Sequence, residues 1–567
     1  MKNEMKFGKG VTRQFQRAVY NSNVEWIQEI LANYSEFDVN YYSNEELKYG
    51  NHNYETLKAI CSNWNKDVSQ AATNNTLEFL LQNNLNPNIK FSNGYYALDM
   101  LCADNKEKSY LVKTMLENGA DPNNASSSGF YNTDLGDENS TTLYLPVFWA
   151  IYEPTLTNAE ELLNHGAEVS YEILDKVHVK NIEGSAKPYQ SAFKIYMEET
   201  GESPFTKAEE YAILGESNKL ISEMKNSEKL NEEAAKTVRD FICRFCNDDA
   251  LKAWEEIYLS ENNYPSEYLI NIAAYEGNYE IIKYLFDKGI EDFTINEALE
   301  RAAKAGSYDV CKYLIENGCL DEKVVSSTIF QAAFQGGDID TFRFLAQYFN
   351  EKGLLCEDDI YYIFVKQVVE WNQYTKNVIN CLMDDCGLNM NVFVSDDMNH
   401  DTIEYLFNKG KQLSVFDLPF AITAQEPITV KYILEKGAIP NQGAFSFKFN
   451  MSDEERQMLL LPYEESPAAV NSNDIDSCIE YAIKYGTSEI VQMLIDHGAD
   501  LSDEEILACA ITDSSKATFD VLFNAGASLD YKNDKSKETL VDLAKSMGRD
   551  DIVKILRKAK VKSYSGF

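Results

Sequence analysis

The chain has 567 residues, of which 44% are apolar and 12% aromatic, and this composition is sufficient for a folded protein and argues against a disordered one. Acidic side chains number 91 against 52 basic ones, and the resulting formal charge of −39 makes nucleic acid and anionic lipid poor partners. The 11 cysteines stand singly in helical apolar patterns, as Cys311, Cys478 and Cys509 do, which argues against a disulfide framework and favours a reducing compartment.

A pair of segments recurs along the chain, and each copy closes with a glycine. In chain order the closing glycines are Gly119, Gly166, Gly289, Gly318, Gly437, Gly498 and Gly526. The residues sixteen positions before them are all alanine, namely Ala103, Ala150, Ala273, Ala302, Ala421, Ala482 and Ala510. The residues four positions before them are all apolar, namely Met115, Leu162, Leu285, Leu314, Ile433, Leu494 and Leu522. Gly410 keeps Leu406 but has Val394 in place of the alanine, so one copy departs from the rule.

The spacing and the residue types predict a unit of two helices and about 30 residues. Gly289 and Gly318 lie 29 residues apart, and Gly498 and Gly526 lie 28 apart. We expect the fixed alanine on a first helix, at a point where the neighbouring unit leaves room for little more than a methyl group. Units this short cannot bury their apolar faces alone, so they must stack on one another.

Glycine marks the end of both predicted helices. A mid-unit glycine (Gly277, Gly306 or Gly486) ends the first helix and the closing glycine ends the second, because the residue that follows a helix commonly needs φ > 0. Asn84 replaces the closing glycine in an earlier copy, and asparagine is the next most tolerant residue in this conformation.

These features resemble the ankyrin repeat. The family pattern is visible in residues 111–123, 161–169 and 489–500, and residues 538–559 resemble a closing unit, with Thr539 and Asp542–Ala544 in the places of the family's T-P-L-H-x-A segment. The resemblance covers roughly residues 15–559 and is weak at 171–265, 350–400 and 441–475. It implies an all-α solenoid, elongated and curved, of about 14 to 17 helix-pair units. Complete T-P-L-H boxes are absent and many units are shorter than the family's, so we expect the β-turn fingers to be shortened or lost.

The organisation predicted in chain order consists of repeats interrupted by two insertions. N-terminal repeats (1–123) are followed by a polar loop (124–142), one further repeat (143–170) and divergent helical repeats (171–265). Central repeats (266–440, divergent at 350–400) lead into an insertion (441–475) with a short helix that a capping box at Ser452–Glu455 would begin. The C-terminal repeats and their cap occupy residues 476–567.

No segment of the sequence carries a complete catalytic or metal-binding motif. His165 and His497 share one repeat position, and His52, His178 and His400 have no ligand at metal spacing nearby. Cys243 and Cys246 form a lone CxxC without the second ligand pair that zinc needs, and we interpret them as core residues. Cys381 and Cys386 match no known spacing, and the Gly8–Gly10 segment is not a phosphate-binding loop. We therefore predict a protein that is not an enzyme and has no cofactor and no metal.

The resemblance implies a protein-binding scaffold that uses the concave face of the solenoid. In the register above, the residues two and three positions after the fixed alanine should face that groove, and the candidate partner-binding residues are Tyr152, Glu153, Tyr275, Glu276, Lys304, Lys484 and Tyr485. The partner is another protein, possibly a basic one, and we expect a cytoplasmic monomer. No apolar run approaches the roughly 20 residues that span a bilayer, and the first residues lack the apolar core of a signal peptide.

Two alternatives remain open from the sequence. The chain could be an acidic inhibitor or immunity-type protein that neutralises a basic, nucleic-acid-acting partner by charge complementarity. It could also be an effector with a catalytic insert in residues 171–265, an idea that fails if this segment folds as ordinary helix pairs.

Overall fold

A computed structural model describes residues 9–43, 53–61, 68–91, 94–103, 110–124, 145–152, 156–177, 185–258, 266–288, 295–318, 320, 327–355, 373–387, 399–414, 417–441, 477–533 and 537–564. The chain divides into two compact units. Unit 1 comprises Met1–Phe91, Val368–Trp371 and Asn389–Phe567, and unit 2 comprises Ser92–Gln367 and Asn372–Leu388. The two ends of the chain therefore belong to one unit, and a long internal segment forms the other.

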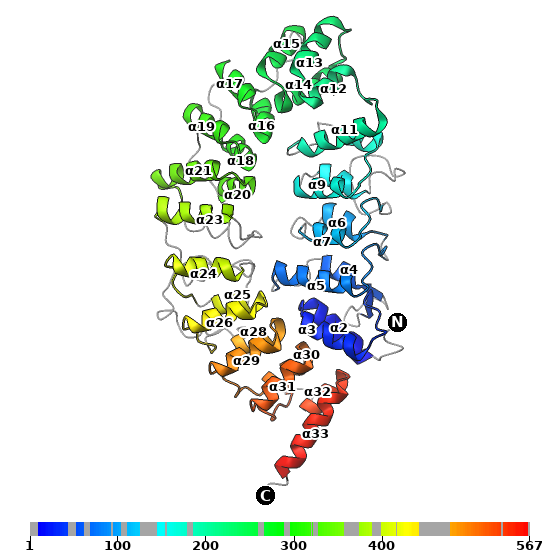
Figure 1. The fold of residues 1–567 in the computed structure, drawn as a ribbon, viewed down its shortest axis with the longest axis vertical. Coiled ribbons are helices and arrows are strands. Elements are labelled where there is room, and N and C mark those ends of the chain that lie inside the picture. Colours follow the sequence, from blue (N-terminus) through cyan, green and yellow to red (C-terminus); the bar gives the residue numbers. More distant parts are fainter. Residues whose placement is uncertain are drawn as a thin grey trace. The chain divides into compact units, whose positions relative to one another are not determined.

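Unit 2 consists of helices in its described residues, and most of them follow one another as pairs (Figure 1). Their bounds are α6 (Ala97–Ala103), α7 (Leu111–Glu117), α8 (Pro146–Tyr152), α9 (Leu156–Asn164), α10 (Tyr171–Lys176), α11 (Lys187–Thr200), α12 (Lys207–Leu214), α13 (Ser217–Asn226), α14 (Glu232–Phe245), α15 (Asp248–Tyr258), α16 (Ser266–Glu276), α17 (Tyr279–Asp287), α18 (Asn296–Lys304), α19 (Tyr308–Asn317), α20 (Ser327–Gly336), α21 (Ile339–Glu351), α23 (Gln373–Asn380) and the short π-helix η4 (Cys381–Asp385).

Unit 1 is built from both ends of the chain. Its N-terminal part holds α2 (Lys9–Tyr20), α3 (Val24–Asn33), strands β1 (Tyr41–Ser43) and β2 (Asn53–Glu55), α4 (Thr56–Cys61) and α5 (Gln70–Gln82). Its C-terminal part holds α24 (His400–Asn408), α25 (Asp417–Thr423), α26 (Pro427–Glu435), α28 (Cys478–Tyr485), α29 (Ser488–Asp496), α30 (Ile506–Asp513), α31 (Lys516–Asn524), α32 (Leu540–Ser546) and α33 (Asp550–Tyr564).

The helices of each unit form two layers. In unit 2, the first helices α12, α14, α16, α18 and α20 pack on one another in sequence order, and the second helices α13, α15, α17, α19 and α21 do the same. Figure 1 shows α16, α18 and α20 in one row and α17, α19 and α21 in another beside it. In unit 1, α25, α28, α30 and α32 form the first-helix row, and α24, α26, α29 and α31 form the second. The predicted helix-pair solenoid is therefore confirmed.

The fixed alanines that the structure describes lie on first helices, as the sequence predicts. Ala150, Ala273, Ala302, Ala421, Ala482 and Ala510 are all buried, with at most 1% of their surface exposed. Because the alanines are buried on helices that pack against one another, a longer side chain would overpack the core around them.

The residues that end the helices confirm most of the expected left-handed conformations, and they correct one closing glycine, Gly318, and one mid-unit glycine, Gly486. Asn84 has φ +71° and Gly526 has φ +90°, so asparagine does replace glycine in this role. Gly318 and Gly486 instead have φ −103° and −91°. At Gly486 an added Cβ would lie 2.7 Å from the carbonyl oxygen of Ala482, and at Gly318 it would collide with Ile295. Glycine is required at these two positions by close packing and not by positive φ.

An asparagine joins each turn to the turn of the next described unit in three places. The Asn123 side-chain amide donates to the carbonyl of Gly166 (3.0 Å), and its oxygen accepts from the backbone N–H of Glu168 (2.8 Å). The same pair of bonds recurs from Asn40 to Asn84 and Asn86, and from Asn441 to Gly498 and Asp500. These bonds satisfy backbone groups at the turns and fix the spacing of consecutive units.

Regular β structure is sparse among the described residues. Strands β1 and β2 pair antiparallel, with Tyr42 opposite Tyr54, and one isolated bridge joins Lys532 to Thr539. This agrees with shortened β-turn fingers in the described part of the chain. The polar loop at 124–142 and the insertion at 441–475, with its capping box at Ser452–Glu455, lie almost entirely outside the described residues.

The divergent segment 171–265 continues the stack in its described part. Helices α12 and α13 pair, α14 and α15 pair, and α14 packs on both α12 and α16. Helix α12 starts at a full capping box between Thr206 and Glu209. The segment is therefore made of helix pairs wherever the structure describes it.

Candidate functional site

Polar and aromatic side chains on the first helices of unit 2 form a continuous series of contacts from one helix to the next. The Tyr268 hydroxyl (α16) donates to Asp240 Oδ2 (α14) at 3.3 Å. The Asn271 side-chain amide (α16) donates to Glu297 Oε2 (α18) at 2.8 Å, and the Thr328 hydroxyl (α20) donates to Glu300 Oε2 (α18) at 3.0 Å. We call this surface, made by α14, α16, α18 and α20, the first-helix face.

A cation–π contact strengthens the middle of the first-helix face. The Arg301 guanidinium lies over the Tyr275 ring, 4.3 Å from its centroid, and Arg301 also pairs with Glu297. Burial raises the pKa of both Tyr275 and Tyr268 above the ordinary tyrosine value. Their hydroxyls therefore remain protonated donors at neutral pH.

Buried charges anchor the end of the first-helix face at α14. Arg239 and Asp240 pair with both side chains 4% exposed, and the Arg239 guanidinium lies over the rings of Trp254 and Tyr268. Burial raises the pKa of Asp240, and the neighbouring Arg239 opposes this shift. The Arg239–Asp240 pair is therefore buried beneath the more exposed ring of Tyr268.

Glu276 was expected to face a partner, and the structure contradicts this expectation. Its side chain is 2% exposed and lies 3.1 Å from the Arg244 guanidinium. It also accepts from the Ser185 hydroxyl (2.8 Å) and from the backbone N–H of Ala186 (2.5 Å), which precedes α11. The residues just before α11, some 90 positions earlier in the sequence, therefore cover the Glu276 carboxylate. Glu276 makes an internal contact and does not face a partner.

The other candidate residues divide between exposed and buried positions. Lys304 is exposed, Tyr275 and Lys484 are half-buried, and Tyr485 is only 9% exposed because its ring packs against Tyr481 at 4.8 Å. Tyr485 is therefore unavailable to a partner. Glu153 and the side chain of Tyr152 lie outside the described residues.

The positions that the sequence reasoning missed follow from helical periodicity. Residues two and five positions before the fixed alanine share a helix face with the residue two positions after it, because these offsets differ by four and three. Tyr268 and Asn271 stand at these positions relative to Ala273, as Glu297 and Glu300 do relative to Ala302. The sequence analysis chose only residues that follow the fixed alanine, so it omitted these four, which precede it.

The family comparison supports this interpretation of the fold. A family model described as "Ankyrin repeats (3 copies)" matches residues 244–325 and 269–355. Residues 244–355 are ankyrin repeats. No curated protein matches the chain.

The ankyrin repeats include most of the first-helix face, since α16, α18 and α20 all lie within the matched residues. Their second helices carry aromatic pairs of their own: Tyr279 with Tyr313 (centroids 5.4 Å apart) and Tyr308 with Phe344 (5.3 Å). Tyr279 and Tyr308 are each 36% exposed. Because the second helices also expose tyrosines, substitutions there can serve as controls for substitutions on the first-helix face.

The histidines that share a repeat position have a structural role. His165 and His497 each bond through Nδ1 to the carbonyl four residues earlier, at 2.8 Å in both cases, and so satisfy a carbonyl at the helix end. His400 packs its ring against Tyr432. His52 and His178 lie outside the described residues.

Cysteines and acids of the described residues form no cluster of three or more that could hold a metal ion. Cys243 and Cys246 are buried, and burial raises the pKa of Cys246 to about 12. Both thiols therefore stay protonated at neutral pH, as core residues do. Among the described helices, none is long and apolar enough to cross a lipid bilayer.

Proposed function

We propose that this chain is a non-enzymatic scaffold that binds another protein through the first-helix face of its ankyrin repeats. The supporting observation is the series of contacts that joins the polar and aromatic side chains of α14, α16, α18 and α20 to one another. Side chains that are already held in place lose less conformational entropy when a partner binds.

The chemistry of the exposed groups fits a protein partner. Tyr268 is 45% exposed and offers a rigid ring with a polar tip, which is the kind of residue that dominates binding energy at interfaces. Helix α18 of the same face also exposes the carboxylates of Glu297 and Glu300 and the ammonium group of Lys304. A mixed polar rim around an aromatic anchor is typical of interfaces that form and dissociate.

The double variant Tyr268→Ala/Lys304→Glu tests this proposal. We expect it to fold as the wild type and to lose at least tenfold in the recovery of every specific partner, measured by affinity purification from the native host and quantitative mass spectrometry. The matched control is Tyr308→Ala/Lys312→Glu, which makes the same two changes at exposed positions of α19 in the second-helix layer. Loss of partners in the control, with retention in the first-helix variant, would place the interface on the opposite layer.

The alternative of an acidic inhibitor rests on the net charge of −39 and on the exposed Glu297 and Glu300. It uses the same first-helix face as the main proposal, but its partner would be a basic protein that acts on nucleic acid. Electrostatic steering predicts an association rate that falls by a factor of ten or more between 50 and 500 mM salt. A rate that changes less than threefold would favour the scaffold of mixed polarity.

The alternative of a catalytic insert in residues 171–265 gains no support from the described part of this segment, where α12–α15 stack as helix pairs. We also propose a cytoplasmic location. It is supported by the burial of eight of the nine described cysteines as thiols, which a reducing compartment preserves.

A further inference from the structure

Two cysteine thiols meet where the described part of unit 2 ends. Cys381 begins the π-helix η4, which directly continues α23, and Cys386 follows the last residue of η4. The two side chains share a hydrogen bond, and 1% and 8% of their surfaces are exposed. We call these two residues the thiol pair. They lie outside the first-helix face, which is made by α14, α16, α18 and α20.

The π-helical turn is what brings the two thiols together. The backbone N–H of Cys386 donates to the carbonyl of Cys381, five residues earlier, at 3.0 Å. A regular α-helix turns about 100° per residue, so residues i and i+5 would point about 140° apart, on different faces. The i→i+5 bond of a π turn instead moves residue i+5 close to the position that residue i+4 takes in an α-helix. The wider turn therefore places the two thiols in contact, as a disulfide requires.

Helix α21 holds this turn in place from the side. The Asn350 side-chain amide donates to the carbonyl of Cys386 at 3.0 Å. Arg343 Nε, on the same helix, lies 3.4 Å from Asp385 Oδ2. Both contacts join the end of η4 to α21, so the thiol pair is positioned by the packing of helices on one another.

The two thiols differ from each other in a way that suits a redox reaction. The Cys381 S–H donates to the Cys386 sulfur, and this lowers the pKa of Cys386, although burial and the Asp385 carboxylate oppose the shift. The same hydrogen bond, together with burial, raises the pKa of Cys381. Cys386 is also the more exposed of the two, and its neighbours Asp385 and Gly387 are exposed. Because the thiolate is the reactive form, Cys386 is the thiol better suited to meet an oxidant first.

The second close pair of cysteines in unit 2 provides a contrast. Cys243 and Cys246 stand at the end of α14, and 0% and 4% of their surfaces are exposed. Cys246 Sγ donates to the carbonyl of Ala212 on α12 at 3.8 Å. Burial raises the pKa of both thiols. These two cysteines are closer in sequence than the thiol pair but less suited to oxidation, so they serve as an internal control.

We propose that Cys381 and Cys386 form a reversible disulfide when the chain meets hydrogen peroxide. The Cys386 thiolate attacks one peroxide oxygen, the O–O bond breaks, and hydroxide leaves, which makes Cys386 a sulfenic acid. The Cys381 sulfur then attacks the Cys386 sulfur, the S–S bond forms, and the sulfenic hydroxyl leaves as water with the Cys381 proton. In sum, two thiols and one hydrogen peroxide give one disulfide and two molecules of water.

This modification is compatible with a reducing compartment. Disulfides in such compartments are usually transient and redox-sensing, since thiol reductants return them to the dithiol. The site is independent of the partner-binding function proposed above, so either proposal can fail without the other.

A titration of the intact, folded chain with hydrogen peroxide tests the proposal. After each dose the remaining thiols are blocked with N-ethylmaleimide, and peptide mass spectrometry maps the oxidised sites. We expect the Cys381–Cys386 disulfide to form at a peroxide concentration at least tenfold lower than the one that oxidises Cys243 or Cys246. Dithiothreitol should return both residues to thiols. The proposal is overturned if the disulfide forms no earlier than oxidation at Cys243 and Cys246, or forms only after unfolding in urea.

Single variants test the order of the two steps. In Cys381→Ala the Cys386 sulfenic acid has no thiol beside it, so we expect dimedone to label Cys386. In Cys386→Ala we expect Cys381 to stay reduced at the same dose. The control is Cys311→Ala, which removes a fully buried thiol of α19 and should keep the disulfide of the wild type. Dimedone labelling of Cys381 in Cys386→Ala, without labelling of Cys386 in Cys381→Ala, would show that the proposed order of attack is wrong.

Discussion

Glu276→Gln is expected to lower the free energy of unfolding by about 3–5 kcal/mol. The change leaves the Arg244 guanidinium, which is 3% exposed, without the carboxylate 3.1 Å away. An uncompensated buried charge is among the most destabilising products of a single substitution. The Ser185 hydroxyl and the Ala186 N–H also lose a charged acceptor, so the start of α11 should loosen from α16.

Urea unfolding followed by circular dichroism measures the effect, and hydrogen exchange at residues 185–200 locates it. The control is Glu297→Gln, a glutamate on the same face whose side chain is 60% exposed, for which we expect a change of less than about 0.5 kcal/mol. If Glu276→Gln and the wild type unfold at the same urea concentration, Glu276 does not make the internal contact described above. It would then again be a candidate for partner binding.

Asp417→Asn is the second substitution for which we expect a loss of about 3–5 kcal/mol, this time in unit 1. Lys411 Nζ donates to both carboxylate oxygens of Asp417 at 2.8 Å, and the two side chains are 1% and 0% exposed. The backbone N–H of Ser414 donates to the same carboxylate at 2.6 Å. The amide keeps the shape of the side chain but leaves the Lys411 ammonium group buried and unneutralised.

A double-mutant cycle with Lys411→Met separates the pair energy from the cost of its burial. We expect Lys411→Met alone to destabilise by a similar amount, because it leaves the Asp417 carboxylate buried. The double variant Lys411→Met/Asp417→Asn closes the cycle, and its loss should be smaller than the sum of the two single losses, since it leaves neither ion buried. Additive losses in the double variant would contradict a coupled pair.

The helix pairs of each repeat could be predicted from the sequence because their contacts join residues that are close in sequence. The alanine, the apolar residue and the closing glycine recur at fixed distances within one unit, and each reports a contact made inside that unit or with its direct neighbour. Ala273 and Ala302 are buried as expected, and Asn84 adopts the left-handed conformation expected of a glycine substitute. Gly318 shows the limit of this reasoning, since close packing against Ile295 and not positive φ requires it.

The candidate surface was only half predictable, for a related reason. Lys304 and Tyr275 were found by counting from the alanine, and helical periodicity would have added Tyr268, Asn271, Glu297 and Glu300. Periodicity assigns a residue to a helix face but does not say what covers that face. Tyr485 is covered by Tyr481, a contact within one helix that the choice of interface residues did not take into account.

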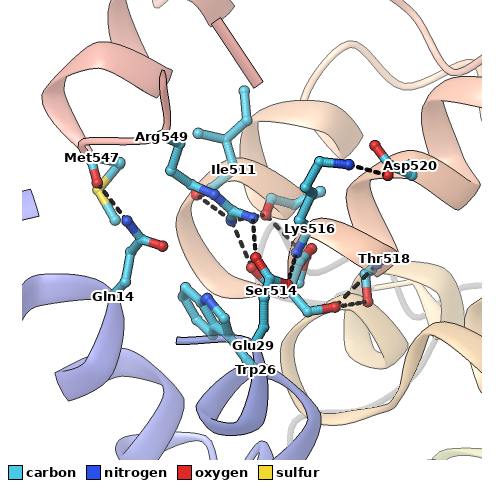
Figure 2. A network of polar contacts seen from close by, with 12 residues as sticks. Gln14, Trp26, Glu29, Ile511, Ser514, Lys516, Thr518, Asp520, Met547 and Arg549 are labelled. Carbon is cyan, nitrogen blue, oxygen red and sulfur yellow. Dashed lines mark hydrogen bonds and ion pairs between the residues drawn. The ribbon is translucent and has the colours of Figure 1, made fainter. Parts of the chain in front are cut away.

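The sequence by itself determined the helix pairs and their register, because these depend on side chains within about 30 residues of one another. Only the tertiary structure decided that the residue before α11 binds Glu276 and that Glu29 of α3 binds the start of α31 (Figure 2). Those contacts join residues 90 and 487 positions apart. Nothing in a repeat pattern encodes such pairings, because they arise from complementary charge and shape between surfaces that the repeats have already formed.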